Sequence, residues 1–401
     1  MDLEGISALL TEQGWALLES LPPYEEAEAM ALGERLRAAG NPPALVAAAL
    51  TQSRLRAAAR AKFGPFAAGM LFTPAGLEQA TRLQVAARHA QRFASAGVER
   101  VADLGCGVGS DSMALVTFDR EVLAVERDEL TAAVATMNLR HWPEANVRCE
   151  DATTTDLTGF GGAFVDPARR RMDGSASGKR LLDPREGSPP LSFVLDLAGR
   201  LPAVGLKTAP GIPHHLVPEG AEAQWISVAG DLVEAGLWFG LLARDGVRRA
   251  ALVLPADGDE SVSPTEVTDA GMPEPDVGPV GQVLYEPDAA VIRAGLVGQV
   301  AAAVGGRLLD RTIAYVTGDR LVRTPLATAY AVEDVFPFQL KSLRTWLRDR
   351  GVGRLTIKKR GTAVEPEQLR RQLRLDGDAE ATIVLTRVAG RQSVLAVRPV
   401  R

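Results

Sequence analysis

The segment from Val101 to Asp111 constrains the fold more than any other part of the sequence. An apolar run that ends at Leu104 is followed by glycines at alternate positions, Gly105, Gly107 and Gly109, and then by a helical stretch. Glycine allows the backbone to turn sharply and to approach a ligand without a Cβ in the way, and the N-terminus of the next helix faces that ligand. The segment therefore predicts a strand, a glycine-rich turn and a helix that together hold a ligand.

Two classes of ligand bind at such a turn, and the glycine spacing distinguishes them. Read as GxGxxG from Gly105, the segment has Ser110 where a dinucleotide-binding fold needs a third glycine or an alanine. Read as DxGxGxG from Asp103, it meets every position. A carboxylate at Asp103 suits the ammonium of a methionine moiety and would repel a pyrophosphate. The spacing favours S-adenosylmethionine over a nicotinamide dinucleotide, and an ordinary strand–turn–helix without a ligand is the alternative.

Acidic residues also follow the next two predicted strands. Glu126 ends an apolar strand and can accept hydrogen bonds from ribose hydroxyls, and Asp151 follows another strand and can accept one from an adenine amine. Each of them alone is also explained as a helix cap or a turn residue. Together with Asp103 they would meet at the edge where open parallel sheets bind ligands. The predicted cofactor-binding residues of this edge are Asp103, Gly105, Cys106, Gly107, Gly109, Asp111, Glu126, Asp151 and Ala152.

The order of predicted elements indicates a helical region followed by a parallel α/β sheet. Residues 1–95 have apolar spacings of three and four, interrupted at Pro22-Pro23, Pro42-Pro43 and Gly64-Pro65, which predicts helices. From Glu99, short apolar runs alternate with helical stretches. We expect strands at residues 99–104, 121–126, 145–149, 161–165, 203–207, 224–229 and 249–254.

The remaining chain predicts two small α+β units. Residues 255–280 contain seven acidic side chains, five prolines and no basic side chain, so they form either a linker or a solvated excursion between strands. The sheet domain is expected to end there. The first small unit has a helix from Asp288 and two strands, and the second has two helices, one strand and a final hairpin at residues 381–387 and 392–397.

The formal net charge of −5 is unevenly distributed. Residues 331–401 contain 15 Lys and Arg against 8 Asp and Glu, a local charge of +7, which leaves −12 on the first 330 residues. A basic module attached to an acidic body is the pattern expected of a nucleic-acid contact, although charged helix faces are often only solvated.

Composition and cysteine usage exclude several classes of protein. Apolar residues make up 46% of the chain and charged residues 24%, and no apolar run is long enough to cross a bilayer. The first residues carry no basic segment followed by an apolar stretch and a cleavage site. Cys106, Cys149, His214 and His215 lack metal-ligand spacing. We therefore expect a cytoplasmic protein without a membrane span, a disulfide framework or a bound metal.

These segments together resemble the class I S-adenosylmethionine-dependent methyltransferases, and with the basic tail they resemble the bacterial group that carries a THUMP-like domain. The resemblance covers about residues 72–399. Besides the glycine turn, its anchors are Asp166-Pro167-Ala168-Arg169-Arg170, Leu206-Lys207-Thr208-Ala209-Pro210-Gly211, Leu284-Tyr285-Glu286-Pro287-Asp288 and Phe336-Pro337-Phe338.

The resemblance implies an α/β fold: a Rossmann-like seven-stranded methyltransferase domain with a helical N-terminal region and small C-terminal α+β modules, one ferredoxin-like and one THUMP-like. The implied boundaries are 1–95, 96–280, 281–335 and 336–401. A THUMP-like domain is an RNA-binding module by analogy, which implies a structured RNA substrate such as a tRNA or an rRNA. The alternatives are a methyltransferase of proteins or small molecules whose tail serves assembly, and a non-catalytic nucleotide-binding scaffold.

Asp166 is the predicted catalytic residue. It ends a predicted strand, and Pro167 stiffens the turn that follows, which holds the carboxylate at the sheet edge. Relatives that methylate amines carry Asp/Asn-Pro-Pro and an aromatic residue, whereas this chain has Ala168 and Arg169. Uracil C5 methyltransferases use a cysteine nucleophile, and none lies near Asp166. We expect direct methyl transfer to nitrogen or oxygen, with the proton removed by Asp166 or lost to water.

Phe72-Thr73-Pro74 resembles a segment that closes over the cofactor in cap-guanosine and related RNA methyltransferases, so Thr73 joins the predicted cofactor-binding residues. A helix start with Thr73 as cap and Pro74 in the first turn also explains these residues. The residues expected to contact the substrate are Arg169, Lys207, Lys358, Lys359 and Arg360.

Overall fold

The computed structural model describes residues 3–168, 184–256 and 263–400. The chain forms two units, one of Met1–Glu222 with Ala235–Arg244 and one of Ala223–Glu234 with Asp245–Arg401. Among the described residues, no helix is long and apolar enough to span a membrane.

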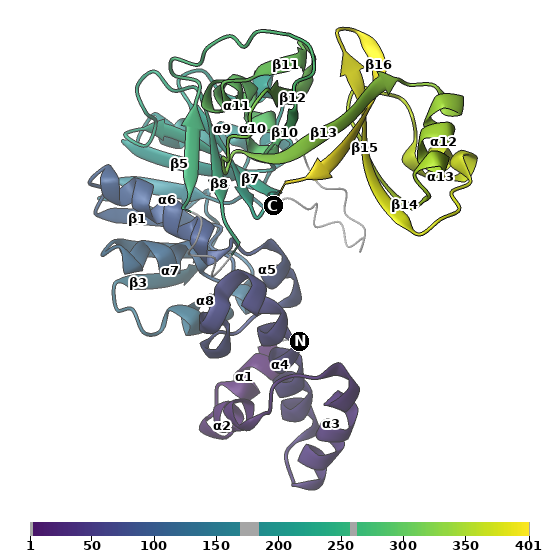
Figure 1. Ribbon diagram of the computed structural model, residues 1–401. Coiled ribbons are helices and arrows are strands. Elements are labelled where there is room, and N and C mark those ends of the chain that lie inside the picture. The colour runs from purple at the N-terminus through teal and green to yellow at the C-terminus, as the bar shows by residue number, and fades with distance from the viewer. Residues whose placement is uncertain (1–2, 169–183, 257–262, 401) are drawn as a thin grey trace. The chain divides into compact units, whose positions relative to one another are not determined.

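The N-terminal part of the first unit is helical, as predicted (Figure 1). The expected interruptions are confirmed, because one helix starts at Pro43 and ends before Gly64, and the next starts at Pro74. Proline fits the first turn of a helix, where its missing N–H has no partner to lose. The helices are α1 (Leu3–Leu9), α2 (Glu12–Ser20), α3 (Ala29–Ala38), α4 (Pro43–Phe63), α5 (Pro74–Gln79) and α6 (Leu83–Ser95), with short 3₁₀ turns at Glu26–Glu28 and Gly64–Gly69.

A parallel sheet follows, and its strand order determines where a ligand can bind. In the first unit the order is β3-β2-β1-β4-β5-β7, with β7 antiparallel to β5. Strands β2 and β3 follow β1 on one side of it, and β4 and β5 lie on its other side, so the order reverses at β1. In such sheets ligands bind at the carboxyl ends of the strands beside the reversal. The strands are β1 (Arg100–Leu104), β2 (Glu121–Glu126), β3 (Ala145–Cys149), β4 (Gly162–Val165), β5 (Ala203–Thr208) and β7 (Asp231–Gly240). The helices are α7 (Ser110–Thr117), α8 (Glu129–Leu139) and α9 (Leu191–Ala198).

Between residues 99 and 280, two strands are present that were not among the seven expected there. The first is β7, in which Trp238 is fully buried and stacks on Phe164 of β4 at a ring-centroid distance of 6.0 Å. The second is β9 (Thr265–Thr268), which pairs antiparallel with β8 (Arg249–Leu254) inside the stretch expected to be a linker or an excursion. All seven expected strands are present, including β6 (Glu222–Val228), which pairs parallel with β8.

The last part of the chain forms one continuous sheet in the order β11-β12-β10-β13-β16-β15-β14. The predicted boundary between residues 335 and 336 falls inside β13 (Ala327–Pro337), which pairs with β10 on one side and β16 on the other. The other strands are β10 (Val283–Pro287), β11 (Arg307–Asp310), β12 (Ile313–Gly318), β14 (Val352–Lys359), β15 (Ala379–Val388) and β16 (Arg391–Pro399). The helices are α10 (Ala289–Ala294), α11 (Val297–Val304), α12 (Leu340–Asp349) and α13 (Pro366–Leu373).

Helices α12 and α13 cover the outer end of this sheet (Figure 1). Leu343 and Leu347 of α12 and Leu369 and Leu373 of α13 share a buried cluster with strand residues such as Ile383. Apolar residues three or four positions apart place one face of each helix on the sheet, so the opposite faces, which carry most of the charges, are exposed.

Candidate cofactor and active site

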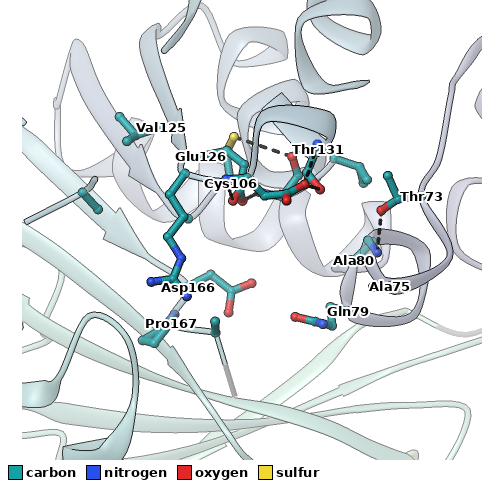
Figure 2. Close-up of a pocket in the computed structure, with 18 of the residues that line it drawn as sticks. Thr73, Ala75, Gln79, Ala80, Cys106, Val125, Glu126, Thr131, Asp166 and Pro167 are labelled. Carbon is teal, nitrogen blue, oxygen red and sulfur yellow. Dashed lines mark hydrogen bonds between the residues drawn. The ribbon is translucent and has the colours of Figure 1, made fainter. Parts of the chain in front are cut away.

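A cavity of about 930 Å³ lies at the carboxyl ends of β1, β2 and β4 in the first unit (Figure 2). Its wall is formed by six segments: the start and end of α5 with Thr81, the glycine turn, the end of β2 with the start of α8, the turn after β3, Asp166–Ala168, and Ser188-Pro189. The predicted cofactor-binding residues on this wall are Thr73, Gly105, Cys106, Gly107, Asp111, Glu126, Asp151 and Ala152. Asp103 and Gly109 are not on it.

The backbone of the glycine turn favours glycine at each of its three positions, and contacts exclude any other residue at Gly105. Gly105, Gly107 and Gly109 have φ of 91°, 55° and 89°, in the left-handed region that residues with a Cβ rarely adopt. A Cβ on Gly105 would lie 2.4 Å from the carbonyl oxygen of Asp166. A Cβ on Gly107 would meet no heavy atom within 4 Å. Because Gly107 lines the cavity, this open space is available to a ligand. The turn therefore lets β1 approach β4 and exposes backbone to a ligand.

Two fixed carboxylates stand at the cavity edge. The two oxygens of Glu126 accept hydrogen bonds from the backbone N–H of Gly107 at 3.2 Å and of Asp128 at 2.9 Å. Asp151 accepts from the hydroxyl and backbone N–H of Thr153, and these bonds lower the pKa of Asp151. Ionised carboxylates accept hydrogen bonds only, so this pair suits the hydroxyl and amine hydrogens of an adenosine.

Thr73 is the helix cap that one interpretation predicts, and its predicted contact with the cofactor stays a prediction. Its hydroxyl accepts a hydrogen bond from the backbone N–H of Gly76 at 2.9 Å, which makes Thr73 the N-cap of α5. It also lines the cavity. A Cβ on Gly76 would lie 2.6 Å from Val108 of the glycine turn, so the cap places the start of α5 directly against that turn.

Asp103 lies beneath the glycine turn instead of on the cavity wall. Its side chain is buried and accepts a hydrogen bond from the Ser112 hydroxyl at 2.5 Å. Burial, with the negative charge of Asp111 nearby, raises the pKa of Asp103 to about 8. We predicted a direct contact between Asp103 and the ammonium of the cofactor. The buried position of Asp103 does not favour this contact, which stays a prediction.

Replacing Asp103 with asparagine should change how stability depends on pH. Because the folded pKa lies above the ordinary value, the carboxyl group stabilises the fold at pH 4 and loses this contribution as pH rises toward 8. Asparagine does not titrate and can still accept from Ser112. Between pH 5 and pH 8 the wild type should therefore lose on the order of 3 kcal/mol of unfolding free energy relative to the variant. Urea unfolding at both pH values measures this, and a difference that does not depend on pH would contradict it.

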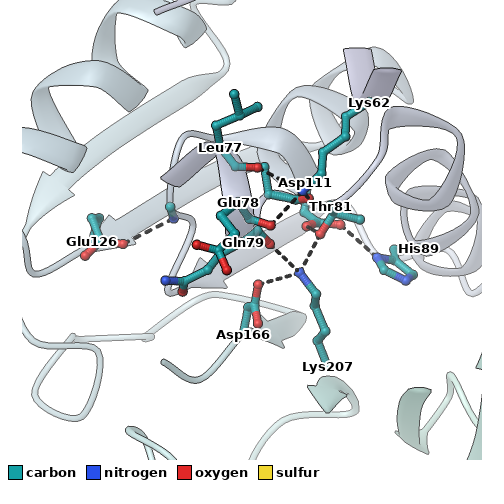
Figure 3. A network of polar contacts seen from close by, with 12 residues as sticks. Lys62, Leu77, Glu78, Gln79, Thr81, His89, Asp111, Glu126, Asp166 and Lys207 are labelled. Atoms are coloured by element: carbon teal, nitrogen blue, oxygen red, sulfur yellow. Dashed lines mark hydrogen bonds and ion pairs between the residues drawn. The ribbon is translucent and has the colours of Figure 1, made fainter. Parts of the chain in front are cut away.

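Asp111 lines the cavity, but its carboxylate is held inside the protein (Figure 3). It accepts a hydrogen bond from the Thr81 hydroxyl at 2.7 Å and lies 2.7 Å from Nδ1 of His89, whose side chain is 2% exposed. Burial favours the neutral acid, but the hydrogen bond and charge of His89 outweigh it and lower the pKa of Asp111. Asp111 is therefore ionised, and His89 donates through Nδ1.

Asp166 is on the cavity wall, and its carboxylate is bonded to Lys207 (Figure 3). The ammonium of Lys207 donates to Asp166 Oδ2 at 2.7 Å, to the Thr81 hydroxyl at 2.7 Å and to the carbonyl oxygen of Gln79 at 3.5 Å. The side chain of Lys207 is 5% exposed and does not line the cavity. The expected contact between Lys207 and a substrate is therefore not supported by its position. Arg169 lies outside the described residues.

Sequence reasoning missed Lys62, Thr81 and His89. Lys62, near the end of α4, donates to the carbonyl oxygens of Leu77, Glu78 and Ala80, each at 2.8 Å, and so fastens the end of α5 (Figure 3). These three residues lie outside the glycine and Asp-Pro motifs, so no local pattern singles them out. Only the packing of α4, α5 and α6 against the sheet brings them to the site.

The three cations predicted to contact a substrate in the tail already have carboxylate partners. Lys358 lies 2.6 Å from Glu286, and Arg360 lies 3.8 Å from the same residue. Burial opposes the charge of Lys358, but hydrogen bonds with Glu286 and Tyr330 raise its pKa to about 12. Lys359 pairs with Glu365 at 2.7 Å. Much of their charge is therefore compensated inside the second unit.

Comparisons with known proteins give two domain matches, a relative with a named enzyme class and a solved structure with the same fold. A family profile described as "THUMP domain-like" matches residues 327–399, and one described as a domain of unknown function (DUF8688) matches residues 2–59. An uncharacterised S-adenosylmethionine-dependent methyltransferase of Mycobacterium tuberculosis, from strains H37Rv and CDC 1551, is 35% identical over 323 residues, which span 79% of this chain and 85% of the relative. The crystal structure of a methyltransferase candidate from Porphyromonas gingivalis W83 has the same fold, with a TM-score of 0.72 and 20% identity over 95% of this chain and 100% of that one.

Proposed function

Because the chain belongs to the S-adenosylmethionine-dependent methyltransferases, we propose that it transfers the methyl group to a structured RNA, a tRNA or an rRNA. The observation that carries the RNA assignment is the THUMP domain-like match over residues 327–399. This segment contains 14 Lys and Arg against 8 Asp and Glu. Such a surplus of positive charge suits a phosphate backbone.

We propose that S-adenosylmethionine binds in the cavity of the first unit. The open space at Gly107 and the carboxylates of Glu126 and Asp151 fit its adenosine part, and they support the predicted cofactor-binding residues on the wall. When bound, the cofactor supplies a methyl group on a positively charged sulfur. Asp166, on the same wall, is the proposed catalytic residue, which orients the acceptor through a hydrogen bond and takes up its proton.

We propose that the outer face of α12 makes the main RNA contact. Lys341, Arg344 and Arg348 are spaced three and four residues apart and are exposed. Arg344 donates to the carbonyl oxygen of Gln372, and Arg348 makes only a surface pair with Asp349 at 3.7 Å. Few aromatic side chains are exposed here, since Phe336, Phe338 and Trp346 pack partly against the buried cluster. Contact with the RNA backbone is therefore favoured over reading of bases.

Neutralising this face should weaken RNA binding. The triple variant Lys341→Gln, Arg344→Gln, Arg348→Gln should lower affinity for unfractionated tRNA at least about 10-fold at 0.1 M salt and reduce the salt slope by about 2. The matched variant Lys358→Gln, Lys359→Gln, Arg360→Gln should mainly lower the melting temperature, because it breaks internal ion pairs. Filter binding across a salt series measures both variants. A larger loss of affinity in the second variant would place the contact on β14 instead.

Transfer of labelled methyl from S-adenosylmethionine to total RNA tests the proposed substrate. The RNA comes from a strain that lacks the gene, and total protein from the same strain is the control acceptor. Label in one RNA size fraction is expected. Label in protein alone, or in neither pool despite cofactor binding, would reject the RNA assignment and favour a protein or small-molecule acceptor.

A further inference from the structure

A buried chain of hydrogen bonds runs from Asp166 into the interior of the first unit (Figure 3). It passes from Asp166 to the ammonium of Lys207, from Lys207 to the hydroxyl of Thr81, from Thr81 to Asp111, and from Asp111 to His89, each step at 2.7 Å. The four residues beyond Asp166 come from β5, the loop after α5, α7 and α6. Four separate elements thus converge on one carboxylate of the cavity wall.

The chemistry of these groups determines the direction of each hydrogen bond. An ammonium only donates, so the Thr81 hydroxyl accepts from Lys207 and must direct its own hydrogen to Asp111. Asp111 is ionised and only accepts, so His89 carries its hydrogen on Nδ1. Lys207 therefore lies between two negative charges, one bonded directly and one through Thr81. These two carboxylates offset the cost of burying the ammonium of Lys207, whose side chain is 5% exposed.

We propose that Lys207 and Thr81 are positioning residues of the methyl transfer, which hold the carboxylate of Asp166 at the cavity wall, and that Lys207 does so without contacting the substrate. The inference rests on the proposed function in one respect, the catalytic role of Asp166. Among the described residues Asp166 lines the cavity and Lys207 does not, so Lys207 acts on a bound acceptor through its bond to Asp166.

Side chains of the N-terminal helix α4 fix the position of the segment that carries Thr81. Lys62 fastens the three carbonyl groups at the end of α5, and Thr81 follows one residue after the last of them. Gln52 of α4 pairs with both backbone groups of Phe72, just before the start of α5. Helix α4 thus holds both ends of the segment that carries Thr81, which connects the N-terminal helices to the orientation of Asp166.

Thermal unfolding and a double-mutant cycle test the pairing without any substrate. Lys207→Met removes the cation bonded directly to Asp166 and, through Thr81, linked to the buried Asp111, and should lower the melting temperature by roughly 8 °C. Asp166→Asn in the same chain removes one of these charges and should restore part of the loss, so the two changes are not additive. Additive effects would overturn the proposal.

Kinetics then separate positioning from substrate contact. Lys207→Met should lower kcat on the order of 100-fold with little change in KM for RNA or cofactor, and the acid limb of the kcat–pH profile should move up by about 1 pH unit. Lys207→Arg, which keeps the charge, should restore part of kcat. A raised KM for RNA with unchanged kcat would show that Lys207 contacts the substrate and would overturn the proposal.

Thr81→Val keeps the test decisive if Lys207→Met does not fold. It replaces the hydroxyl of Thr81 with a methyl group of similar volume and should lower kcat about 10-fold. The control is Thr136→Val on α8, whose hydroxyl bonds only its own helix at Ala132 and which should leave kcat unchanged. Equal effects of the two threonine variants would overturn the proposal. A wild type that labels no RNA would reject the proposed function alone, because the thermal cycle still decides whether Lys207 holds Asp166.

Discussion

Asp166→Asn is expected to lower kcat about 1000-fold while S-adenosylmethionine still binds with unchanged affinity. Asparagine preserves the shape of the side chain and can accept a hydrogen bond from Lys207, but it cannot take a proton from the acceptor. Its position between Pro167 and the end of β4 is fixed by the backbone and does not change with the substitution. Single-turnover transfer of labelled methyl measures kcat, and calorimetric titration with S-adenosylmethionine measures binding.

Asp156→Asn is the matched control for this experiment. Asp156 is an exposed carboxylate that accepts from Thr158 and does not line the cavity. It should leave both kcat and cofactor binding unchanged. If Asp166→Asn retained more than about a tenth of the wild-type kcat, loss of the proton to water would suffice, and Asp166 would serve only to orient the acceptor.

Gly105→Ala is expected to cost about 4 kcal/mol of unfolding free energy. The backbone at φ 91° strains any residue with a Cβ, and the added methyl would lie 2.4 Å from the carbonyl oxygen of Asp166. Strain in the left-handed region and overpacking each contribute roughly 1–3 kcal/mol. The clash also pushes β1 and β4 apart at the cavity wall. Urea unfolding measures the loss.

Gly107→Ala provides the comparison, because only the backbone strain is shared. Its φ is 55°, and a Cβ there meets no heavy atom within 4 Å. It should cost about 1 kcal/mol of stability but weaken S-adenosylmethionine binding, since the methyl group enters space beside the cavity. Equal losses of stability in the two variants would show that the contact with Asp166 does not matter.

The cavity wall was predictable where it depends on short segments. The alternation of Gly105, Gly107 and Gly109 specifies a turn within one strand and one helix, and Glu126 and Asp151 follow strands whose apolar runs are clear. Strand ends of a parallel sheet share one edge, so local spacing was enough to bring these residues together. Their binding roles stay predictions until the cofactor is titrated.

The interior of the site was not predictable in this way. His89 looks like an ordinary position on the buried face of α6, and Thr81 like a loop residue. Lys207 was expected to face a substrate, but its ammonium turns inward to Asp166 and Thr81. These side chains become hydrogen-bond partners because segments far apart in the sequence pack together. A single sequence does not show which distant segments are in contact. Strand β7 was missed for a related reason, because Glu234 and Gly236 interrupt its apolar run.

The shared strand β13 means that the THUMP domain-like segment, residues 327–399, cannot be removed or transferred as an independent domain. Its match begins at residue 327, yet its first strand pairs with β10, at Val283–Pro287, far outside that match. A chain that ends before β13 would expose the backbone edge of β10 that normally pairs with β13. An isolated segment that starts at β13 would expose the edge of β13 that normally pairs with β10. Open edges of this kind recruit foreign strands and favour aggregation. Any exchange of tails between relatives must therefore carry β10 to β12 along with it.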